Sequence, residues 1–443
     1  MPGALRTGNV KTMNALFLPG AAGRPAAEAG TRLRGGRERA LVTAATLAIM
    51  AAAFPACCRA ETWAAMPAFT LTGIPQPMDV EVGDLNMDGR PDLAIASWHR
   101  LPGAKEQYDR AKSRIYIYYG KPGFYAAPAD RELAVKNPVA IRIGDFDRDG
   151  TNDLAVNPYD MFHLFLGREG LAVDHSCPDV NGGGGQLAAG VLGGRDLCDF
   201  VSGPVWRRWS GGDSFEHGYF HGPEINDNTA SFLADLDVDG NIDVIFLPKD
   251  RSSIRLYYGP FLSMKVLARE LSRFTVLSAP MPLGPGVAIG DWNNDGRPDI
   301  AASSAGGGDL SRRRLFIYYQ DAPLLFTEQA GPSATVEGIS GMLCASDVNM
   351  DGLDDLVAGN TADGSVSVFL QKKGSAFAAS LKEADQTLAV GALHFMRVAD
   401  FTGDGAPDLV VGDTRSTVKG FVNLSPAQGP RPAQGPGTRG IKP

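Results

Sequence analysis

The chain of 443 residues has only five cysteines and no surplus of positive charge. Five cysteines are too few for a scaffold held together by disulfides. A net charge of -8 argues against a nucleic-acid-binding protein, because such a protein neutralises phosphates with surplus lysine and arginine. The sequence also lacks the nucleophile elbow of hydrolases, the glycine-rich loop of nucleotide sites and the zinc-protease motif. These absences favour a binding module over an enzyme.

Three of the cysteines lie beyond the first 60 residues. Cys177 and Cys198 form a disulfide if the compartment is oxidising and remain thiols otherwise, and their spacing does not decide between the two. Cys344 lies in an apolar, strand-like pattern and is expected to be a buried thiol.

Residues 1–60 differ from the rest of the chain in charge and composition. Four arginines at positions 32–39 precede an uncharged, alanine-rich run at 40–58, a pattern typical of an export signal, with cleavage expected after Ala60. Alternatives are an uncleaved membrane anchor, a lipidated cysteine at a poor lipoprotein site (Cys57) and a buried helix. We therefore expect an exported protein, extracellular, periplasmic or at the cell surface. It would contact a membrane only through this leader, if the leader is uncleaved or lipidated.

One phrase recurs along the remaining chain: an apolar stretch, then D-x-[DNT]-x-D-G-x-x-D, then a second apolar stretch. A seventh copy, from Gly190, keeps the apolar stretches and Asp199 but has lost the other loop carboxylates. Self-similarity at a fixed period is the signature of a repeat architecture. The six intact copies begin at Asp84, Asp145, Asp235, Asp291, Asp347 and Asp400.

The repeats predict an all-β protein, a seven-bladed β-propeller over residues 66–425, followed by a disordered Pro/Gly-rich tail at 426–443. Each copy supplies the first two strands of a blade. A fourth, weaker strand is expected after most of the third strands, for example around Phe326 in one blade and around Phe377 in another. The last unit stops after three strands, so the orphan strand at 68–72 is expected to complete the last blade and close the ring. Third strands are expected from Ile115, His163, Gly218, Ile254, Leu315, Val366 and Val418.

The acidic loops have the donor pattern of a hard-cation site. Oxygens at positions 1, 3, 5 and 9 and a carbonyl at position 7 suit calcium, whereas zinc would require nitrogen or sulfur and magnesium dehydrates reluctantly. A turn with solvated aspartates accounts for one such copy but not for six in register. Up to six calcium ions are expected, with these ligands: Asp84, Asn86, Asp88, Arg90, Asp92; Asp145, Asp147, Asp149, Thr151, Asp153; Asp235, Asp237, Asp239, Asn241, Asp243; Asp291, Asn293, Asp295, Arg297, Asp299; Asp347, Asn349, Asp351, Leu353, Asp355; Asp400, Thr402, Asp404, Ala406, Asp408.

The loops also account for the acidity of the chain. Beyond residue 60 there are 34 basic and 48 acidic residues, a net charge of -14, and the six loops hold 20 carboxylates. Six calcium ions would bring that net charge to about -2. The two loops with four carboxylates should bind most tightly, and the loop at Asp400, with Thr402 at position 3, most weakly.

These motifs resemble the FG-GAP/VCBS repeat family, calcium-bearing propeller repeats that are also found in the integrin α-subunit head. The resemblance covers residues 69–423 and implies adhesion, scaffolding or glycan-contacting modules, with polysaccharide lyases as a minority. It places the metal loops on one face and the partner-binding loops, between the second and third strands, on the opposite face. The third copy departs from the pattern and should hold no metal.

On the expected partner face, tryptophan and arginine suggest stacking on sugars or contact with acidic groups. The alternative is that these are solvated turns with one tryptophan packed into a neighbouring blade. We expect a secreted or cell-surface calcium-binding propeller that binds a glycan or an extracellular protein. A polysaccharide lyase or hydrolase and a purely structural surface protein are the alternatives. The candidate ligand-face residues are Trp98, Arg100, Trp206, Arg207, Arg208, Trp209, Arg312, Arg313 and Arg314.

Overall fold

The computed structural model describes most of the chain between residues 62 and 425. The leader at 1–60, Arg100 and the tail at 426–443 lie outside the described residues. Within the described part, no helix is long and apolar enough to cross a membrane. The described residues are 62–99, 112–158, 161–178, 186–192, 198–211, 214–220, 230–248, 250–261, 274–305, 310–320, 322, 326, 332, 334–339, 341–374, 377–413 and 416–425.

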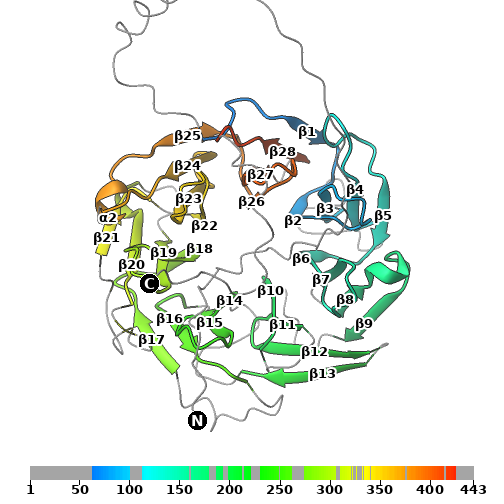
Figure 1. The fold of residues 1–443 in the computed structure, drawn as a ribbon, viewed down its shortest axis with the longest axis horizontal. Helices are drawn as coiled ribbons and strands as arrows, with labels where there is room; N and C mark the ends of the chain where they lie inside the picture. The colour runs from blue at the N-terminus through cyan, green and yellow to red at the C-terminus, as the bar shows by residue number, and fades with distance from the viewer. Residues whose placement is uncertain are drawn as a thin grey trace, which may run out of the picture. The chain divides into compact units, whose positions relative to one another are not determined.

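Seven four-stranded antiparallel sheets are arranged around a common centre, which confirms the seven-bladed propeller (Figure 1). Consecutive strands pair within each blade from the centre outward, apart from the last blade. The first three blades are β2 (Pro77–Gly83), β3 (Asp92–Ser97), β4 (Arg114–Tyr118) and β5 (Arg131–Ala134); β6 (Pro138–Gly144), β7 (Asp153–Pro158), β8 (Met161–Phe165) and β9 (Asp174–Pro178); and β10 (Leu187–Gly190), β11 (Asp199–Ser202), β12 (Val205–Gly211) and β13 (Ser214–Tyr219).

The remaining blades follow the same plan, with short helical turns in some connections. Their strands are β14 (Ala230–Ala234), β15 (Asp243–Leu247), β16 (Ser253–Tyr257) and β17 (Phe274–Ser278); β18 (Leu283–Gly290), β19 (Asp299–Ser304), β20 (Arg314–Tyr318) and β21 (Ala334–Glu337); β22 (Met342–Ser346), β23 (Asp355–Asn360), β24 (Ser365–Phe369) and β25 (Gln386–Ala389); and β26 (Phe395–Ala399), β27 (Asp408–Gly412), β28 (Thr417–Phe421) and β1 (Phe69–Thr72). The helical turns are η1 (Gly167–Glu169), η2 (Leu310–Arg312) and α2 (Phe377–Ser380).

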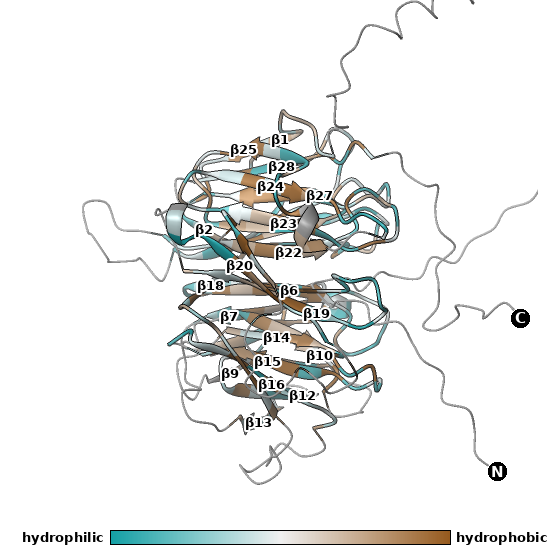
Figure 2. Ribbon diagram, turned by 90° about the vertical axis from the view of Figure 1, so that its left-hand side faces the viewer, coloured by the Kyte–Doolittle hydropathy of each residue, from teal (hydrophilic) through white to brown (hydrophobic). Residues whose placement is uncertain are grey.

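The hydrophobic core lies between the blades. The buried apolar residues fall into seven clusters, and each cluster joins two consecutive blades. Second strands such as β3 and β19 are buried at every residue, because both of their faces pack against a neighbouring blade. Figure 2 shows the matching pattern, with hydrophobic stretches along the strands and hydrophilic segments in the loops. Each blade is therefore stable only in the company of its neighbours.

Strand β1 closes the ring, as the sequence predicts. It pairs antiparallel with β28, with Phe69 opposite Gly420 and Leu71 opposite Val418. The Phe69 ring packs edge-on at 5.1 Å from Tyr125 of the first blade and 5.2 Å from Phe401 of the last. Any side chain at position 420 would overlap that ring, which is why the facing residue is glycine.

The segment before β1 continues the closure. Trp63 is fully buried, and its indole Nε1 donates a 2.9 Å hydrogen bond to the carbonyl of Pro407 in the last blade. The Gln386 amide of the sixth blade accepts from the Trp63 N–H at 2.8 Å and donates to the Trp63 carbonyl at 2.6 Å. The N-terminal segment therefore bridges the sixth, seventh and first blades.

A cluster of charges joins the inner strands on both sides of the first blade. Arg142 of β6 lies 3.2 Å from Asp79 and 3.3 Å from Glu81 of β2, and Arg397 of β26 lies 3.2 Å and 3.1 Å from the same two carboxylates. Glu81, Arg142 and Arg397 occupy the same place in their blades, three residues before the acidic loop. Burial raises the pKa of Glu81, and the two guanidinium groups oppose that shift. The cluster ties the last, first and second blades together at their inner edge.

Three strand assignments made from the sequence are wrong. In the third blade the third strand is β12, whereas the residues from Gly218 end the outer strand β13. Phe326 is not in a strand and Phe377 begins α2; both are buried in connections, and the outer strands nearby are β21 and β25. The aromatic residues suggested strands because they are apolar, but they fill gaps between blades.

We expect Phe69→Ala to destabilise the ring far more than Thr70→Ala in the same strand. Truncation of a buried phenylalanine costs about 3–5 kcal/mol, whereas Thr70 is exposed. Chemical denaturation of both variants measures the difference. Equal stabilities would show that β1 does not hold the last blade to the first.

Candidate metal centres

Six acidic loops lie at one end of the propeller. Each loop connects the inner strand of a blade to its second strand, and the inner strands all run in the same direction around the ring. The loops of the first, second, fourth, fifth, sixth and seventh blades therefore share one face, called here the loop face. The connections between second and third strands emerge on the opposite face.

Each loop is folded around the aspartate at position 1. In the second blade, Asp145 Oδ1 accepts from the Asp149 N–H and Oδ2 from the Gly150 N–H, both at 3.0 Å. Asp149 Oδ1 in turn accepts from the Thr151 N–H at 2.8 Å. The other five loops repeat these bonds at the equivalent positions. The side-chain oxygens are thus held in place by the backbone of their own loop.

The loop backbone is strained in a repeated way. Position 4 adopts a left-handed conformation in all six loops, with φ between 58° and 77°, and only the last loop has glycine there. A non-glycine residue in this region costs about 1–3 kcal/mol and persists only where the surroundings enforce it. Position 6 is glycine in every loop, with φ between 84° and 91°. The residues at position 4 are Met87, Arg148, Val238, Asn294, Met350 and Gly403.

Two of the loops bring three carboxylates together. In each of the sets Asp145, Asp147, Asp149 and Asp235, Asp237, Asp239, the side-chain oxygens lie within 4.8 Å of one another. These are the two loops with four carboxylates in the sequence. The pKa of Asp237 is raised to about 6, chiefly by burial and secondly by the charge of Asp239. Such a group of oxygens attracts a proton or a cation.

Asparagine or threonine at position 3 changes the contacts within the other loops. Asn86 Nδ2 donates to Asp88 Oδ2 at 3.1 Å, and Asn349 Nδ2 donates to Asp351 Oδ2 at 3.0 Å. In the last loop, the Thr402 hydroxyl donates to Asp400 Oδ1 at 3.2 Å. In these three loops, the side chain at position 3 therefore donates a hydrogen bond to a carboxylate of the same loop.

The aspartate at position 9 holds the blade together. In the sixth blade, Asp355 Oδ2 accepts the N–H of Val348 at 3.0 Å, and Oδ1 accepts the N–H of Gln371 at 2.8 Å. The side chain thus joins the start of its loop to the end of the third strand. The same pair of bonds recurs in all six blades, and each aspartate is completely buried; these residues are Asp92, Asp153, Asp243, Asp299, Asp355 and Asp408.

Burial sets the acidity of these six carboxyls. It raises the pKa of Asp299 and of Asp355 to about 8, although the N–H donors to each act in the opposite direction. The same cause raises the pKa of Asp153 to about 7. The sequence pattern assigned position 9 to a metal alone, and its role in joining two strands was missed. The signal was present, because Asp199 survives in the one copy that has lost its other loop acids.

Side-chain amides couple four of the six loops to a neighbouring blade. Gln320 Nε2 of the fifth blade donates to the Leu236 carbonyl in the fourth-blade loop at 2.8 Å, and Asn423 Nδ2 of the seventh donates to the Val348 carbonyl in the sixth-blade loop at 2.8 Å. Asn152 and Gln371 make equivalent bonds to the loops of the first and fifth blades. The sequence reasoning missed these amides, although aligning the ends of the third strands brings three of them together.

Most of the expected ligand-face residues are buried, so their expected exposure on that face is wrong. Trp206, Arg207, Arg208 and Trp209 lie in strand β12 and are buried. They pack between blades, because a third strand is covered on both faces and even its charged side chains turn inward. The prediction assumed that arginine next to tryptophan marks an exposed loop.

The remaining ligand-face candidates are mixed. Trp98 is buried, and its Nε1 donates to the Pro138 carbonyl of the second blade at 2.7 Å. Arg313 is buried and lies 3.0 Å from Asp363, and Arg314 is half-buried, 3.1 Å from Glu337. Arg312 is exposed.

Cys177 and Cys198 are thiols buried in the layer between the second and third blades, so the structure contains no bridge between them. Cys344 is likewise a thiol, but it is partly exposed.

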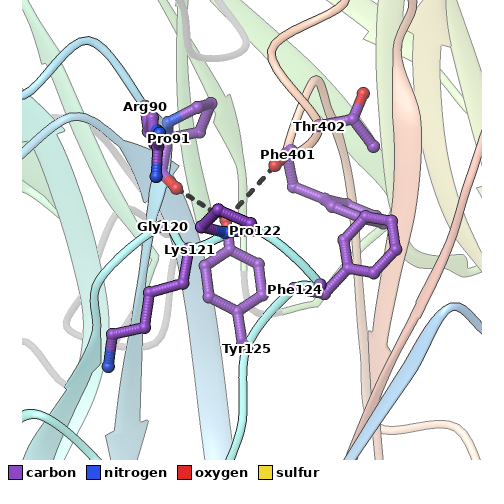
Figure 3. Close-up of a pocket in the computed structure, with 10 residues that line it drawn as sticks. Arg90, Pro91, Gly120, Lys121, Pro122, Phe124, Tyr125, Phe401 and Thr402 are labelled. Atoms are coloured by element: carbon purple, nitrogen blue, oxygen red, sulfur yellow. Dashed lines mark hydrogen bonds between the residues drawn. The ribbon is translucent and has the colours of Figure 1, made fainter.

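Two hollows lie at the ends of the blades. A hollow of about 390 Å³ on the loop face lies between the last and first blades, with Arg90 and Phe401 in its wall (Figure 3). Tyr125 also lines the hollow, and its hydroxyl donates to the carbonyls of Pro91 at 2.8 Å and Phe401 at 3.3 Å. The second hollow, of about 240 Å³, lies on the opposite face and is lined by Arg251, Gly284, Pro285, Ser304, Ala305, Gly341, Asn360 and Thr361.

Comparisons with known proteins agree with the repeat and the fold. Residues 347–411 match a family described as FG-GAP-like repeat, in agreement with the resemblance in the sequence. No curated protein matches the chain. Two similar solved structures are crystals of BBS1N in complex with ARL6DN, one soaked with mercury and one with lead. Each has a TM-score of 0.51 at 12% identity and covers 83% of this chain and 98% of that chain, which shows a shared fold alone.

Asp355→Asn should destabilise the metal-free protein, whereas Asp351→Asn should change its stability little. An amide at position 355 directs a donor at a buried N–H, and leaving such a group unsatisfied costs about 1–3 kcal/mol. Asp351 is exposed, so an amide there keeps an oxygen for the Leu353 N–H, and the bond that it loses, from Asn349 Nδ2, is replaced by water. Denaturation in the presence of chelator compares the two, and equal losses would contradict the structural role of position 9.

Proposed function

Because the chain is a seven-bladed propeller that contains an FG-GAP-like repeat, we propose that it is an exported binding module whose six acidic loops hold calcium. The observation that carries the proposal is the shared loop geometry. In each loop, oxygen-rich side chains are fixed by the backbone before any ion arrives. Preorganised oxygen donors are what a hard cation of flexible coordination requires.

The donor set fits calcium in chemistry as well as in number. Positions 1, 3, 5 and 9 offer carboxylate, amide or hydroxyl oxygens, and position 7 offers a backbone carbonyl. Calcium would neutralise the converging carboxylates and link the two ends of each loop. Arg168 already makes ion pairs with Asp147 and Asp149, and Arg297 with Asp295. These guanidinium groups support the view that the loop oxygens attract positive charge.

Export rests on the leader at residues 1–60. Outside the cytoplasm calcium is abundant, and extracellular calcium modules function with dissociation constants of about 0.1–1 mM. Loops with only three carboxylates are suited to that range. The calcium proposal and the export proposal therefore support each other.

We place the partner surface on the face opposite the acidic loops, around the hollow lined in part by Arg251 and Asn360. The exposed Arg312 lies on the same face, between β19 and β20. A protein partner is favoured over a glycan, because the tryptophans that suggested sugar stacking are buried. The two similar structures are likewise complexes with another protein.

Calcium should raise the thermal midpoint of the protein, and chelator should reverse the rise. Calorimetric titration should count six ions, with the loop at Asp400 the weakest. Asp237→Asn removes a converging carboxylate and should weaken one site. Glu132→Gln makes the same change of charge at an exposed position of β5, outside the loops, and serves as the matched control. A midpoint that is indifferent to calcium would contradict the proposal.

Calcium binding to the loops should depend on pH. Burial raises the pKa of the position 9 carboxyls, for example to about 7 in Asp243 and about 8 in Asp299, so part of them is protonated near neutral pH. Calcium requires the ionised form, so its binding should release protons, and its affinity should fall as the pH is lowered below about 8. Titration in buffers of different ionisation enthalpy measures the released protons.

A photo-crosslinking residue at Arg312 should capture a protein partner, whereas one at Lys373 should not. Both positions are exposed, but Lys373 follows β24 and lies on the loop face. The crosslinked product is identified by mass spectrometry in the cells that export the protein. Capture from position 373 alone would place the partner on the loop face. No capture at either position, together with binding to a defined glycan on an array, would support the glycan alternative.

A further inference from the structure

The third blade lacks an acidic loop but keeps its buried aspartate. Its residues at positions 1, 3 and 5 are Val191, Gly193 and Arg195, so none of these ligand positions keeps a carboxylate, and Asp196 stands at position 6, where the intact loops have glycine. Asp199, at position 9, is completely buried, and its Oδ2 accepts the Leu192 N–H at 2.9 Å. This bond matches the one made by position 9 in the other six blades. The feature common to all seven blades is therefore the buried carboxylate and not the ligand set.

What faces that carboxylate differs in the third blade. In the other six, the residue opposite position 9 on the third strand is aromatic or aliphatic and carries no charge. In the third blade, Asp199 pairs in register with Arg208. Each of the uncharged residues directly follows the last paired residue of its third strand, and so lies opposite position 9. They are Tyr119, Leu166, Tyr258, Tyr319, Leu370 and Val422.

The Arg208 guanidinium binds Asp199 through two parallel hydrogen bonds. Nε donates to Oδ1 at 2.7 Å and Nη2 donates to Oδ2 at 2.9 Å. Arg208 is buried, and its guanidinium carbon lies 5.2 Å from the centre of the Trp206 ring. A buried pair of this kind is strongly destabilised when one partner is removed, because the other charge stays behind in a dry environment. The single arginine and the loss of the loop acids occur in the same blade.

We propose that Arg208 is the tethered cation of the third blade, a covalently attached positive charge that does there what calcium does in the other six. The charge neutralises Asp199, as calcium would neutralise the acids of the other loops, and Arg208 Nε takes the place of the third-strand N–H that binds Oδ1 in the other six blades. The third blade should therefore stay ordered when calcium is withdrawn, while the acidic blades loosen. This inference rests on the proposed calcium sites for its comparison between blades, but the role of Arg208 itself does not depend on them.

Hydrogen exchange read by mass spectrometry tests the proposal blade by blade. In the wild-type full chain, chelator should speed exchange in strands such as β15 and β19 and leave β11 and β12 unchanged. In Arg208→Met, amides of β11 and β12 should exchange about tenfold faster or more, both with calcium and with chelator. Arg208→Lys keeps the charge without the paired geometry, so its exchange rates in β11 and β12 should lie between those of the wild type and of Arg208→Met. It replaces Arg208→Met if that variant does not fold.

A double-mutant cycle with Asp199→Asn separates the pair from general packing. Arg208→Met and Asp199→Asn should each lower the thermal midpoint, and the double variant should be little worse than either single variant. Arg207→Met is the matched control, because Arg207 is equally buried in the same strand but lies 5.5 Å over the Phe162 ring. The loss of thermal midpoint in Arg207→Met should add to the loss in Asp199→Asn.

Four outcomes decide the matter. Unchanged exchange in Arg208→Met, or calcium restoring protection to its third blade, would overturn the role of Arg208. Loss of protection in the wild-type third blade on chelation would overturn it too. If calcium alters no blade, the calcium proposal fails, and the double-mutant cycle still decides whether Arg208 and Asp199 act as a pair.

Discussion

A buried carboxylate at the start of each second strand is the interaction on which the rest of this propeller depends. It occurs in all seven blades, including the one that has lost its acidic loop. In six blades, its two oxygens join the beginning of the loop to the end of the third strand, through backbone N–H donors. A buried acceptor satisfied in this way fixes three chain segments at once, and leaving its donors unsatisfied would be costly. The loop geometry, the strand register and the candidate cation sites follow from this anchor.

The blades in turn depend on one another. The apolar core is divided among seven layers between consecutive blades, so no blade buries its surface alone. A ring of this kind needs a strong closure, and the chain supplies one at the outer edge and one at the inner edge. At the outer edge, β1 pairs with β28, and Phe69 reaches across to the first blade. At the inner edge, Arg397 and Arg142 bind the carboxylates of β2 from both sides.

Charge is handled in two ways around the ring. The six acidic loops gather oxygens that suit a diffusible cation, whereas the third blade holds its own cation on a side chain. If calcium occupies them as proposed, the first arrangement would make stability respond to the surroundings, since ions leave when their concentration falls. The second does not, because Arg208 cannot dissociate. With the partner surface proposed on the opposite face, the acidic loops would stabilise the module and leave recognition to other residues.

The sequence by itself determined the repeat, the number of blades, the closing strand and the candidate cation loops. These follow from local patterns: apolar stretches, the D-x-[DNT]-x-D-G spacing, and the strand left over at residues 68–72. It failed where burial decides. Trp206 and Arg208 looked like an exposed binding loop, because arginine is rarely buried without a partner, and the partner, Asp199, is contributed by a neighbouring strand. Only the tertiary structure decided the second role of position 9 and the place of Trp98 against the next blade, since both depend on groups brought together from distant parts of the chain.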